Sequence, residues 1–569
     1  MKKYTKIEGK GSHHKCAKVC MFGVVVFFLV LLSRMLDNKG QTKPPPPLAM
    51  NAMKKAGHNI VAQTSQAVPP KDVAYCRVQP HSLQDAVEER HLLESNVWPQ
   101  TPSVPENFSL SETSNPRGSN FIILPKDVQQ QWHVGDDLKV LIKMKDFKGN
   151  LKKTGGDFIT ARLHNQALQA GVTGKVVDHL NGSYSAVFPL LWKGMAEVEV
   201  TLIHTSEAIT VLRRITQERP DRIKFMSIFR QGKKTEMSTC NICLRATKEP
   251  ICNYTDIKTG DPWFCYKPKT LDCDTRTTHT MYRFTPEFGP YTKLFQSKVN
   301  MKVFIPPSGA ARVSVLPKEI RVYNSPKISQ PGYYYQGVWR TLSGPPVQQF
   351  NTPTDIGRCL QNKMLFLYGD STVRQWYEYL TATIKDLKPF NINSMAKVGP
   401  YMAVDYQRNT IVRFQIHSIP LVHGPPPVPV AELRYIANEL DTLVGGANTV
   451  VVIGVWAHFG PFPTEFYIRR LQSIRRSVVR LLNRAPDTLV VVRTSNLRYL
   501  TTTIAWTNSD FATVERDKIL RAVFKGVNVR WVDAWDMTLA HYLPHELHPK
   551  PPIIRNMVNV LLSYICPGH

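Results

Sequence analysis

The segment Met364-Leu365-Phe366-Leu367-Tyr368-Gly369-Asp370-Ser371 decides how the second half of this chain is expected to fold. Its apolar run predicts a short buried strand, and the residues from Thr372 to Leu380 have a helix-like pattern. A strand that turns into a helix at Gly-Asp-Ser exposes the serine hydroxyl at the carboxyl edge of a sheet, where open α/β folds place their sites. The amino end of that helix offers backbone N–H groups to an oxyanion. The pattern predicts that Ser371 is a nucleophile, although Gly and Asp are also ordinary turn residues and the motif needs a histidine partner.

Strands and helices alternate from residue 355 onward. Further apolar strands are expected at 410–416, 449–455, 488–493 and 527–532, with helices at 464–484 and 510–525. Nearly continuous apolar strands joined by amphipathic helices predict a mainly parallel sheet covered on both faces. Residues 355–569 are therefore expected to form a three-layer α/β domain. The six arginines of 464–484 are expected to form a solvated face.

The region before this domain has a β pattern. Short, mostly alternating runs such as Leu138–Lys145 and Ala196–Ile203 are separated by turns between residues 121 and 206. This spacing predicts an all-β, immunoglobulin-like sandwich. We assign residues 101–290 to this β domain with its cysteine-rich tail, and the Pro- and Tyr-rich residues 291–354 to a connector.

The amino-terminal region has the pattern of a membrane anchor. Val19–Leu32 is continuously apolar and follows a lysine-rich leader, which predicts a signal-anchor helix over 19–36 and a cytosolic tail over 1–18. A Pro-rich, polar stem would occupy 37–100. The chain is therefore expected to be a single-pass type II membrane protein of the secretory pathway. The short span favours the Golgi, and secretion after cleavage is the alternative.

The cysteines and glycosylation sequons agree with a lumenal location. Eight of the ten cysteines follow the predicted anchor, and an even number in an oxidising compartment predicts disulfides. Cys240 and Cys243 have the spacing of a zinc site, but the later spacings are irregular, so no bound metal is expected. Cys16 and Cys20 could be palmitoylated or could remain plain thiols. N-glycosylation is predicted at Asn107, Asn181 and Asn253.

The charge narrows the class of partner. A net charge of +28 would suggest nucleic acid for a soluble chain, but the predicted anchor removes that partner. What remains is an affinity for acidic partners, such as sialylated glycans, a nucleotide-bearing donor or a membrane surface. A basic surface that serves only solubility is the alternative.

A histidine partner for Ser371 is available after the last predicted strand. That segment contains Asp533, Asp536, His541, His545 and His548. A serine hydroxyl needs a histidine base and a carboxylate that orients the imidazole, and a loop at the carboxyl end of the final strand would lie on the same sheet edge as Ser371. The three histidines could also suggest a metal site, but Pro544 argues against a regular helix that would align them.

With Gly369-Asp370-Ser371 near the start of the domain and His548-Pro549 near its end, the chain resembles the neurexophilin and PC-esterase domain family (NXPE family) from about residue 75 onward. The resemblance implies a membrane anchor, a neurexophilin-like β domain and a C-terminal esterase-like domain of the SGNH type. The wider SGNH group includes plant polysaccharide O-acetyltransferases and sialate O-acetyltransferases. The implied activity is therefore transfer or hydrolysis of acetyl groups on glycans, with sialic acid a plausible acceptor.

The resemblance also implies roles for residues. Ser371 would attack an acyl donor, and His548 would take its proton. The wider group carries Asp three residues before the catalytic His, where this chain has His545, so Asp536 or, as second choice, Asp533 would orient His548. Oxyanion or substrate contacts are expected from Gly369, Asp370, Trp456 and His458. A disulfide between Cys359 and Cys566 is expected to join the two ends of the domain.

Three classes of function fit these features. An acyl group on Ser371 could pass to water, as in an esterase, or to a sugar hydroxyl, as in an O-acyltransferase. The broken Asp-x-x-His pattern instead favours a weak or inactive enzyme that binds a protein partner through its β domain. The third class is a receptor-like structural protein without catalysis. No bound cofactor is expected, and an acetyl donor such as acetyl-CoA would be a cosubstrate.

Overall fold

The computed structural model describes residues 82–126, 131–282, 284, 286–317 and 330–568. All of them belong to one compact unit, Pro69–His569. The predicted tail, the predicted anchor and most of the predicted stem lie outside the described residues, as do Cys16, Cys20 and Cys76. In the part of the chain that is described, no helix has the length and apolar character needed to cross a membrane.

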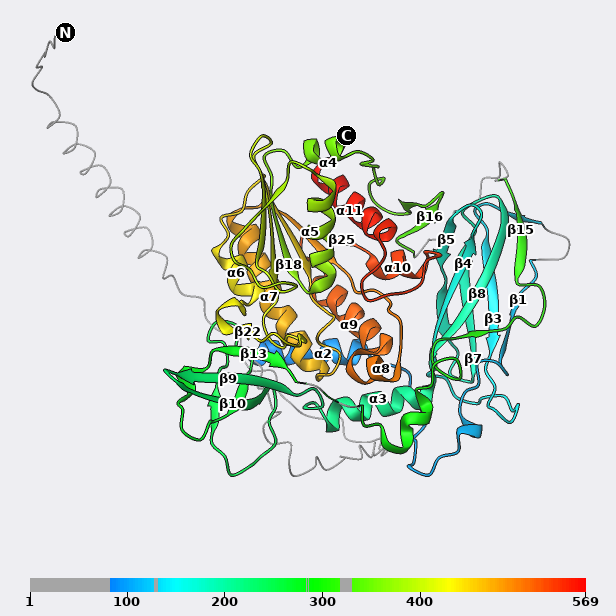
Figure 1. Cartoon of the computed structure of the whole chain (residues 1–569). Coiled ribbons are helices and arrows are strands. Elements are labelled where there is room, and N and C mark those ends of the chain that lie inside the picture. The colour runs from blue at the N-terminus through cyan, green and yellow to red at the C-terminus, as the bar shows by residue number, and fades with distance from the viewer. Residues whose placement is uncertain (1–81, 127–130, 283, 285, 318–329, 569) are drawn as a thin grey trace, which may run out of the picture. The chain divides into compact units, whose positions relative to one another are not determined.

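The strand that precedes Ser371 is the centre of a seven-stranded sheet (Figure 1). β18 (Met364–Gly369) pairs in parallel with β21 (Thr410–Ile416) on one side and with β23 (Thr449–Gly454) on the other. Beyond β23 the sheet continues in parallel with β24 (Leu489–Arg493) and β25 (Arg530–Val532). The opposite edge is antiparallel and consists of β20 (Tyr401–Asp405) and β19 (Lys388–Phe390). The sheet is therefore mainly parallel.

Helices cover both faces of this sheet. α4 (Pro353–Cys359), α5 (Ser371–Thr383) and α11 (Pro551–Ile565) share one apolar core with Leu365 and Leu367. α6 (Ile436–Thr442), α7 (Thr464–Arg484) and α9 (Asp510–Val523) share a second core with Val451 and Ile453. Because successive side chains of a strand point to opposite faces, a continuously apolar strand supplies both layers.

The described residues form three further sheets. A four-stranded antiparallel sheet contains β1 (Asn120–Ile123), β3 (Asp137–Lys143), β7 (Ser183–Pro189) and β6 (Lys175–Asp178). An eight-stranded sheet contains β17 (Val338–Thr341), β16 (Gly332–Tyr335), β5 (Ala170–Thr173), β4 (Phe158–Asn165), β8 (Gly194–His204), β15 (Arg312–Leu316), β2 (Trp132–His133) and β14 (Val303–Ile305). Side chains of both sheets, such as Val140 and Leu163, form one core.

The last sheet joins the strands before residue 355, called the β region below, to the strands and helices of 355–569, called the α/β region. It contains β11 (Ile251–Asn253), β12 (Phe264–Tyr266), β10 (Lys234–Asn241), β9 (Phe225–Gln231), β13 (Thr278–Met281) and β22 (Val428–Pro429). β22 belongs to the α/β region in sequence but pairs with β13. In addition, residues 291–354, which the sequence suggests as a connector, supply β14 to β17. The protein is a mixed α/β protein with several sheets, and its two halves share one of them.

The remaining described helices connect these sheets. They are α2 (Leu83–Ser95), α3 (Ser206–Glu218), α8 (Thr502–Asn508), α10 (Ala534–Leu539) and the short 3-10 helices η2 (Leu110–Glu112), η3 (Cys273–Thr275), η4 (Gly289–Leu294) and η5 (Val430–Glu432). The expectation of a solvated arginine face on α7 is wrong for Arg469 and Arg470, which are buried, whereas Arg480 and Arg484 are exposed. α2 contacts this face and pairs with three of its arginines. Its acidic residues form ion pairs with those arginines: Glu89 with Arg469 at 2.6 Å, Glu88 with Arg475 at 2.7 Å and Asp85 with Arg476 at 2.9 Å.

Candidate active site

The turn between β18 and α5 requires glycine at its first position. A Cβ atom on Gly369 would lie 2.1 Å from the carbonyl oxygen of Gly454 and 2.9 Å from a methyl group of Val373. The neighbouring strand β23 therefore passes too close for any side chain, and the backbone N–H of Asp370 donates to the same carbonyl at 3.1 Å. This close approach brings the end of β23 next to the start of α5.

Asp370 is fully buried and is the N-cap of α5. Its Oδ1 accepts hydrogen bonds from the N–H and the hydroxyl of Thr372, at 2.9 and 2.7 Å. Its Oδ2 accepts from the N–H groups of Trp456 and Ala457, at 3.2 and 2.9 Å. Burial alone would raise the pKa of Asp370, but nearby His458 and these hydrogen bonds outweigh it, so the pKa lies below its usual value. The carboxylate is therefore charged and joins α5 to the turn after β23.

Ser371 is the first residue of α5 and its hydroxyl lies 2.8 Å from Nε2 of His548. This distance meets the criterion for proton transfer between a nucleophile and its base. Desolvation, followed by the positive charge of Arg374, lowers the pKa of His548 below its usual value. His548 is thus neutral at neutral pH and able to accept a proton. Among the hydrogen bonds of the described residues, the N–H of Ser371 has no partner, as expected for the first turn of a helix.

The loop that carries His548 is held by hydrogen bonds on both sides of that residue in the sequence. The side-chain amide of Asn496 donates to the carbonyl groups of Glu546 and Leu547, at 3.1 and 3.3 Å. On the other side, the amide of Gln375 donates to the carbonyl of Pro549 at 3.1 Å. Sequence reasoning missed Asn496, although it lies in a polar run directly after the apolar strand β24 and thus on the same sheet edge as Ser371.

Asn496 is in turn positioned by a buried arginine. Nη2 of Arg493 donates to Oδ1 of Asn496 at 2.7 Å, and its Nη1 donates to the carbonyl of Thr494 at 2.8 Å. Arg493 is fully buried at the end of β24. The Asn496 amide therefore has a fixed orientation, with its NH2 group toward the loop of His548.

The assignment of Asp536 or Asp533 as the carboxylate that orients His548 is wrong for this structure. Oδ1 of Asp536 accepts from the hydroxyl of Thr173 at 2.6 Å, while Asp533 forms an ion pair with Arg521. In the described part of the chain, no carboxylate is hydrogen-bonded to His548. Both aspartates lie at the start of α10, which packs against β5. Burial and neighbouring Asp533 raise the pKa of Asp536 to about 7.

The two predicted oxyanion donors after β23, Trp456 and His458, differ in whether a donor remains available. Trp456 is buried, its N–H is bound to Asp370, and its indole N–H faces the hydroxyl of Thr372 at 3.3 Å. Trp456 is therefore not free to bind an oxyanion, which corrects that assignment. His458 is half-buried, and its Nδ1 lies 2.8 Å from Nε2 of His417. Burial lowers the pKa of His458 to about 4, so its ring is neutral and its Nε2 remains a candidate donor.

The other predicted site features are found as follows. The structure contains the disulfide between Cys359 and Cys566, with a Cα separation of 5.8 Å. Two more disulfides join Cys240 to Cys265 and Cys252 to Cys273, and Cys243 is also disulfide-bonded. The side chains of Asn107, Asn181 and Asn253 are exposed. No cluster of three or more His, Cys, Asp or Glu side chains among the described residues is arranged to hold a metal ion.

The fold and this site define a mixed α/β protein in which a serine and a histidine meet beside a mainly parallel sheet. A family model for the C-terminal domain of NXPE family member 4-like proteins matches residues 339–566, and a neurexophilin model matches residues 87–294. The chain belongs to the NXPE family. It is also similar to a solved structure, the acetyl xylan esterase Est2A from the rumen bacterium Butyrivibrio proteoclasticus, at 10% identity over 82% of this chain and 98% of that chain. The TM-score of that match is 0.18, which supports no argument about fold or activity.

Proposed function

We propose that this protein is a serine acyltransferase or esterase of the SGNH type that acts on O-acyl groups of glycans. The observation that carries the proposal is the 2.8 Å contact between Ser371 Oγ and His548 Nε2 at the amino end of α5. A neutral histidine beside a helix-terminal serine is the arrangement that nucleophilic acyl transfer needs. The finer fold assignments belong to the same proposal: an immunoglobulin-like sandwich over 101–290 and a three-layer SGNH-like domain over 355–569.

The reaction would have two steps. Oγ of Ser371 attacks the carbonyl carbon of the acyl donor while its proton moves to Nε2 of His548. The oxyanion that forms is stabilised by the backbone N–H of Ser371 and by His458. The C–O or C–S bond to the leaving group then breaks, His548 returns the proton to that group, and the acyl ester of Ser371 remains. His548 next takes the proton of water or of a sugar hydroxyl as that oxygen attacks the acyl carbon. The bond between the acyl carbon and Oγ of Ser371 then breaks, and His548 returns the proton to Oγ, which restores the free serine and the neutral histidine.

The proposed substrate and the proposed location are supported by the family and by the charge. An acetyl group is the proposed acyl group, acetyl-CoA or another activated ester is the proposed donor, and sialylated glycoproteins are the proposed acceptors. The net charge of +28 favours acidic glycans over neutral ones. A type II membrane protein of the Golgi would meet such glycans during their passage through the secretory pathway.

The direct test is covalent labelling of the full-length protein by a fluorophosphonate probe. Such a probe reacts with a nucleophilic serine whatever the natural substrate of the enzyme is. Wild type and the exposed-site control Ser343→Ala should be labelled, whereas Ser371→Ala and His548→Ala should not. Labelling of Ser371→Ala at the wild-type level, or no labelling of correctly folded wild type, would refute the proposal. O-acetylation of sialic acids on cells that express each variant then identifies the acceptor.

A binding protein without catalysis is the second candidate. The absence of a carboxylate hydrogen bond on His548, within the described residues, favours it, because most serine–histidine pairs depend on a third group for the tautomer of the imidazole. In that case the neurexophilin-like region would carry the function by contact with a protein partner. The same labelling experiment separates the two candidates, since a binding protein needs no reactive Ser371.

A further inference from the structure

The loop that carries His548 rests on the β region of the protein. Nη1 of Arg162, in β4, donates to the carbonyl oxygen of His541 at 2.6 Å. The guanidinium is fixed from behind by Glu199 of the adjacent strand β8, with Nε to Oε1 and Nη2 to Oε2 distances of 2.9 Å each. The hydrogen bond from Nη2 to Oε2, together with the short distance from Nε to Oε1, restricts the orientation of the guanidinium and therefore the directions in which Nη1 can donate. Arg162 therefore holds the first residue of the loop in a defined place.

The packing around this hydrogen bond is close. A Cβ atom on Gly171 of β5 would lie 2.1 Å from the carbonyl oxygen of Ala540, so strand and loop are in direct backbone contact. The ring of Tyr334 in β16 meets the ring of His541 edge to face, with 4.7 Å between centroids. Three strands of the eight-stranded sheet thus form the surface on which the loop starts.

The second support of His548 is also attached to the β region. The segment that contains Asn496, which binds the carbonyls of Glu546 and Leu547, continues to Arg498 and Leu500. Lys302 donates to the carbonyl of Arg498, and the hydroxyl of Ser297 donates to the carbonyl of Leu500 at 3.3 Å. Both supports of the loop therefore end on residues of the β region.

We propose that the β region is a structural part of the catalytic unit, and that Arg162 is a positioning residue for His548. This inference rests on the proposed function. Since no carboxylate in the described residues is hydrogen-bonded to His548, the place of its ring depends on the backbone of its loop. The hydrogen bond from Arg162 to His541 fixes that backbone where it leaves α10. The β region would then be needed for reactivity of Ser371, beyond any binding of partners.

The test compares two arginines of the same sheet. Arg162 and Arg312 pair with Glu199 and Glu197 respectively, both on β8, but Arg312 is exposed and in β15. Arg162→Met should lower the rate of fluorophosphonate labelling at Ser371 by about tenfold or more, because small displacements of a base have large effects on rate. Arg312→Met should label at the wild-type rate. Arg162→Lys, which keeps a cation beside Glu199 and one donor, should lie between Arg162→Met and wild type.

Hydrogen–deuterium exchange of the full-length variants provides a readout that does not depend on chemistry. Peptides that cover residues 540–549 should exchange faster in Arg162→Met than in wild type and Arg312→Met, while β18 should stay protected in all three. Wild-type labelling in Arg162→Met overturns this proposal, and so does wild-type exchange of the loop. If folded wild type is not labelled at all, the proposed function fails, and the exchange data alone decide whether Arg162 positions the loop.

Discussion

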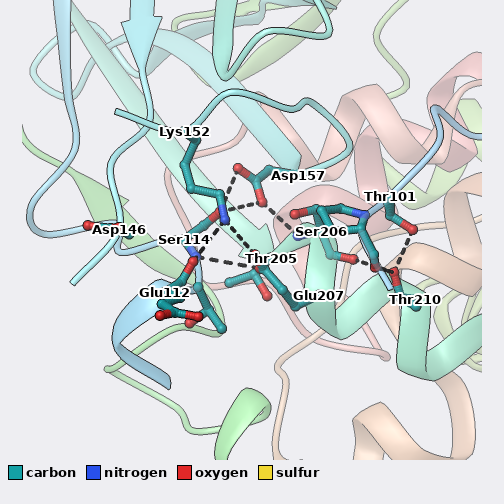
Figure 2. A network of polar contacts seen from close by, with 12 residues as sticks. Thr101, Glu112, Ser114, Asp146, Lys152, Asp157, Thr205, Ser206, Glu207 and Thr210 are labelled. Carbon is teal, nitrogen blue, oxygen red and sulfur yellow. Dashed lines mark hydrogen bonds and ion pairs between the residues drawn. The ribbon is translucent and has the colours of Figure 1, made fainter. Parts of the chain in front are cut away.

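Two buried aspartates of this protein occupy similar places and behave in opposite ways. Asp370 receives a hydrogen bond from an N–H at the start of α5, and Asp157 receives one from the N–H of Ser206, the first residue of α3, at 2.6 Å. Figure 2 shows the surroundings of Asp157, which also accepts from the hydroxyl of Ser114 at 2.9 Å. Both carboxyl groups are buried from solvent.

The neighbouring groups explain the difference. Burial, and then the carboxylate of Glu207, raises the pKa of Asp157 to about 7. Lys152 pairs with Glu207 at 2.6 Å, so its positive charge is shared between Glu207 and Asp157 (Figure 2). Asp370 instead lies near His458 and accepts hydrogen bonds from Thr372, Trp456 and Ala457, and its pKa falls below the usual value. A helix start therefore does not by itself determine whether a carboxylate is charged. At the candidate site the charge is kept, and at α3 it depends on pH.

The largest effect is expected from Asp370→Asn, which removes the charge and replaces one acceptor oxygen by an NH2 group. The N–H groups of Trp456 and Ala457 would lose their partner or the side chain would turn and lose Thr372, so the free energy of unfolding should fall by about 3 kcal/mol. Denaturant unfolding of the full-length protein in detergent measures this. Labelling of Ser371 should also be lost, since α5 and the turn after β23 would separate.

The pH dependence of this effect has a defined sign. The pKa of Asp370 is lower in the folded state, so its contribution to stability is present above the ordinary aspartate pKa and is lost as pH falls through the lowered value. The exposed ion-pair residue Asp386, bound to Arg408, offers a control. Asp386→Asn should change stability by no more than about 0.5 kcal/mol. An equal loss in both variants would contradict the role given to Asp370.

A smaller effect of opposite sign is expected from Asp157→Asn. Because the pKa of Asp157 is raised to about 7, the folded protein keeps a proton that the unfolded chain releases at lower pH, and stability falls as pH rises toward 7. Asparagine avoids the charge repulsion with Glu207. The variant should be more stable than wild type by about 1 kcal/mol above pH 7. This advantage should shrink as pH falls and disappear below the ordinary aspartate pKa. Thermal unfolding of both proteins at a series of pH values tests this. A stability difference between variant and wild type that becomes less favourable to the variant as pH rises would contradict it.

The smallest effect is expected from Asp536→Asn. An asparagine Oδ1 can still accept from the hydroxyl of Thr173, and loss of a charge whose pKa is raised to about 7 should leave stability at neutral pH within about 1 kcal/mol of wild type. The labelling rate of Ser371 should change by less than about twofold. A loss of labelling similar to that of His548→Ala would restore Asp536 as the partner of His548 and would contradict the geometry described above.

The sequence predicts this site in part because chain order alone determines which strand ends meet. An apolar strand before Ser371, parallel strands after it and a loop beyond the last strand place Ser371 and His548 at one sheet edge. The pairing of Cys359 with Cys566 follows from their position at the two ends of the same domain. These inferences need only the order and direction of the strands, which the positions of the apolar runs along the chain indicate.

Side-chain direction was the part that the sequence could not supply. Asp536 faces Thr173, which is 363 residues earlier in the chain, and the arginines of α7 face an acidic helix that starts at Leu83. Both outcomes depend on how the β region and the first described helix pack on the α/β region, and no local pattern encodes that packing. Asn496 was missed for a different reason, since an isolated asparagine after a strand is also a common turn residue.

The order of synthesis gives the contact between Ser371 and His548 a further consequence. Translation releases β18 and Ser371 well before His548, which follows 177 residues later. The β region that holds Arg162 has left the ribosome earlier still. During the synthesis of those 177 residues, a nascent chain would therefore carry its serine and the surface for the loop, but no base. If the proposed function holds, Ser371 would become reactive only after the last loop has folded, so an incompletely synthesised chain would carry an unreactive serine.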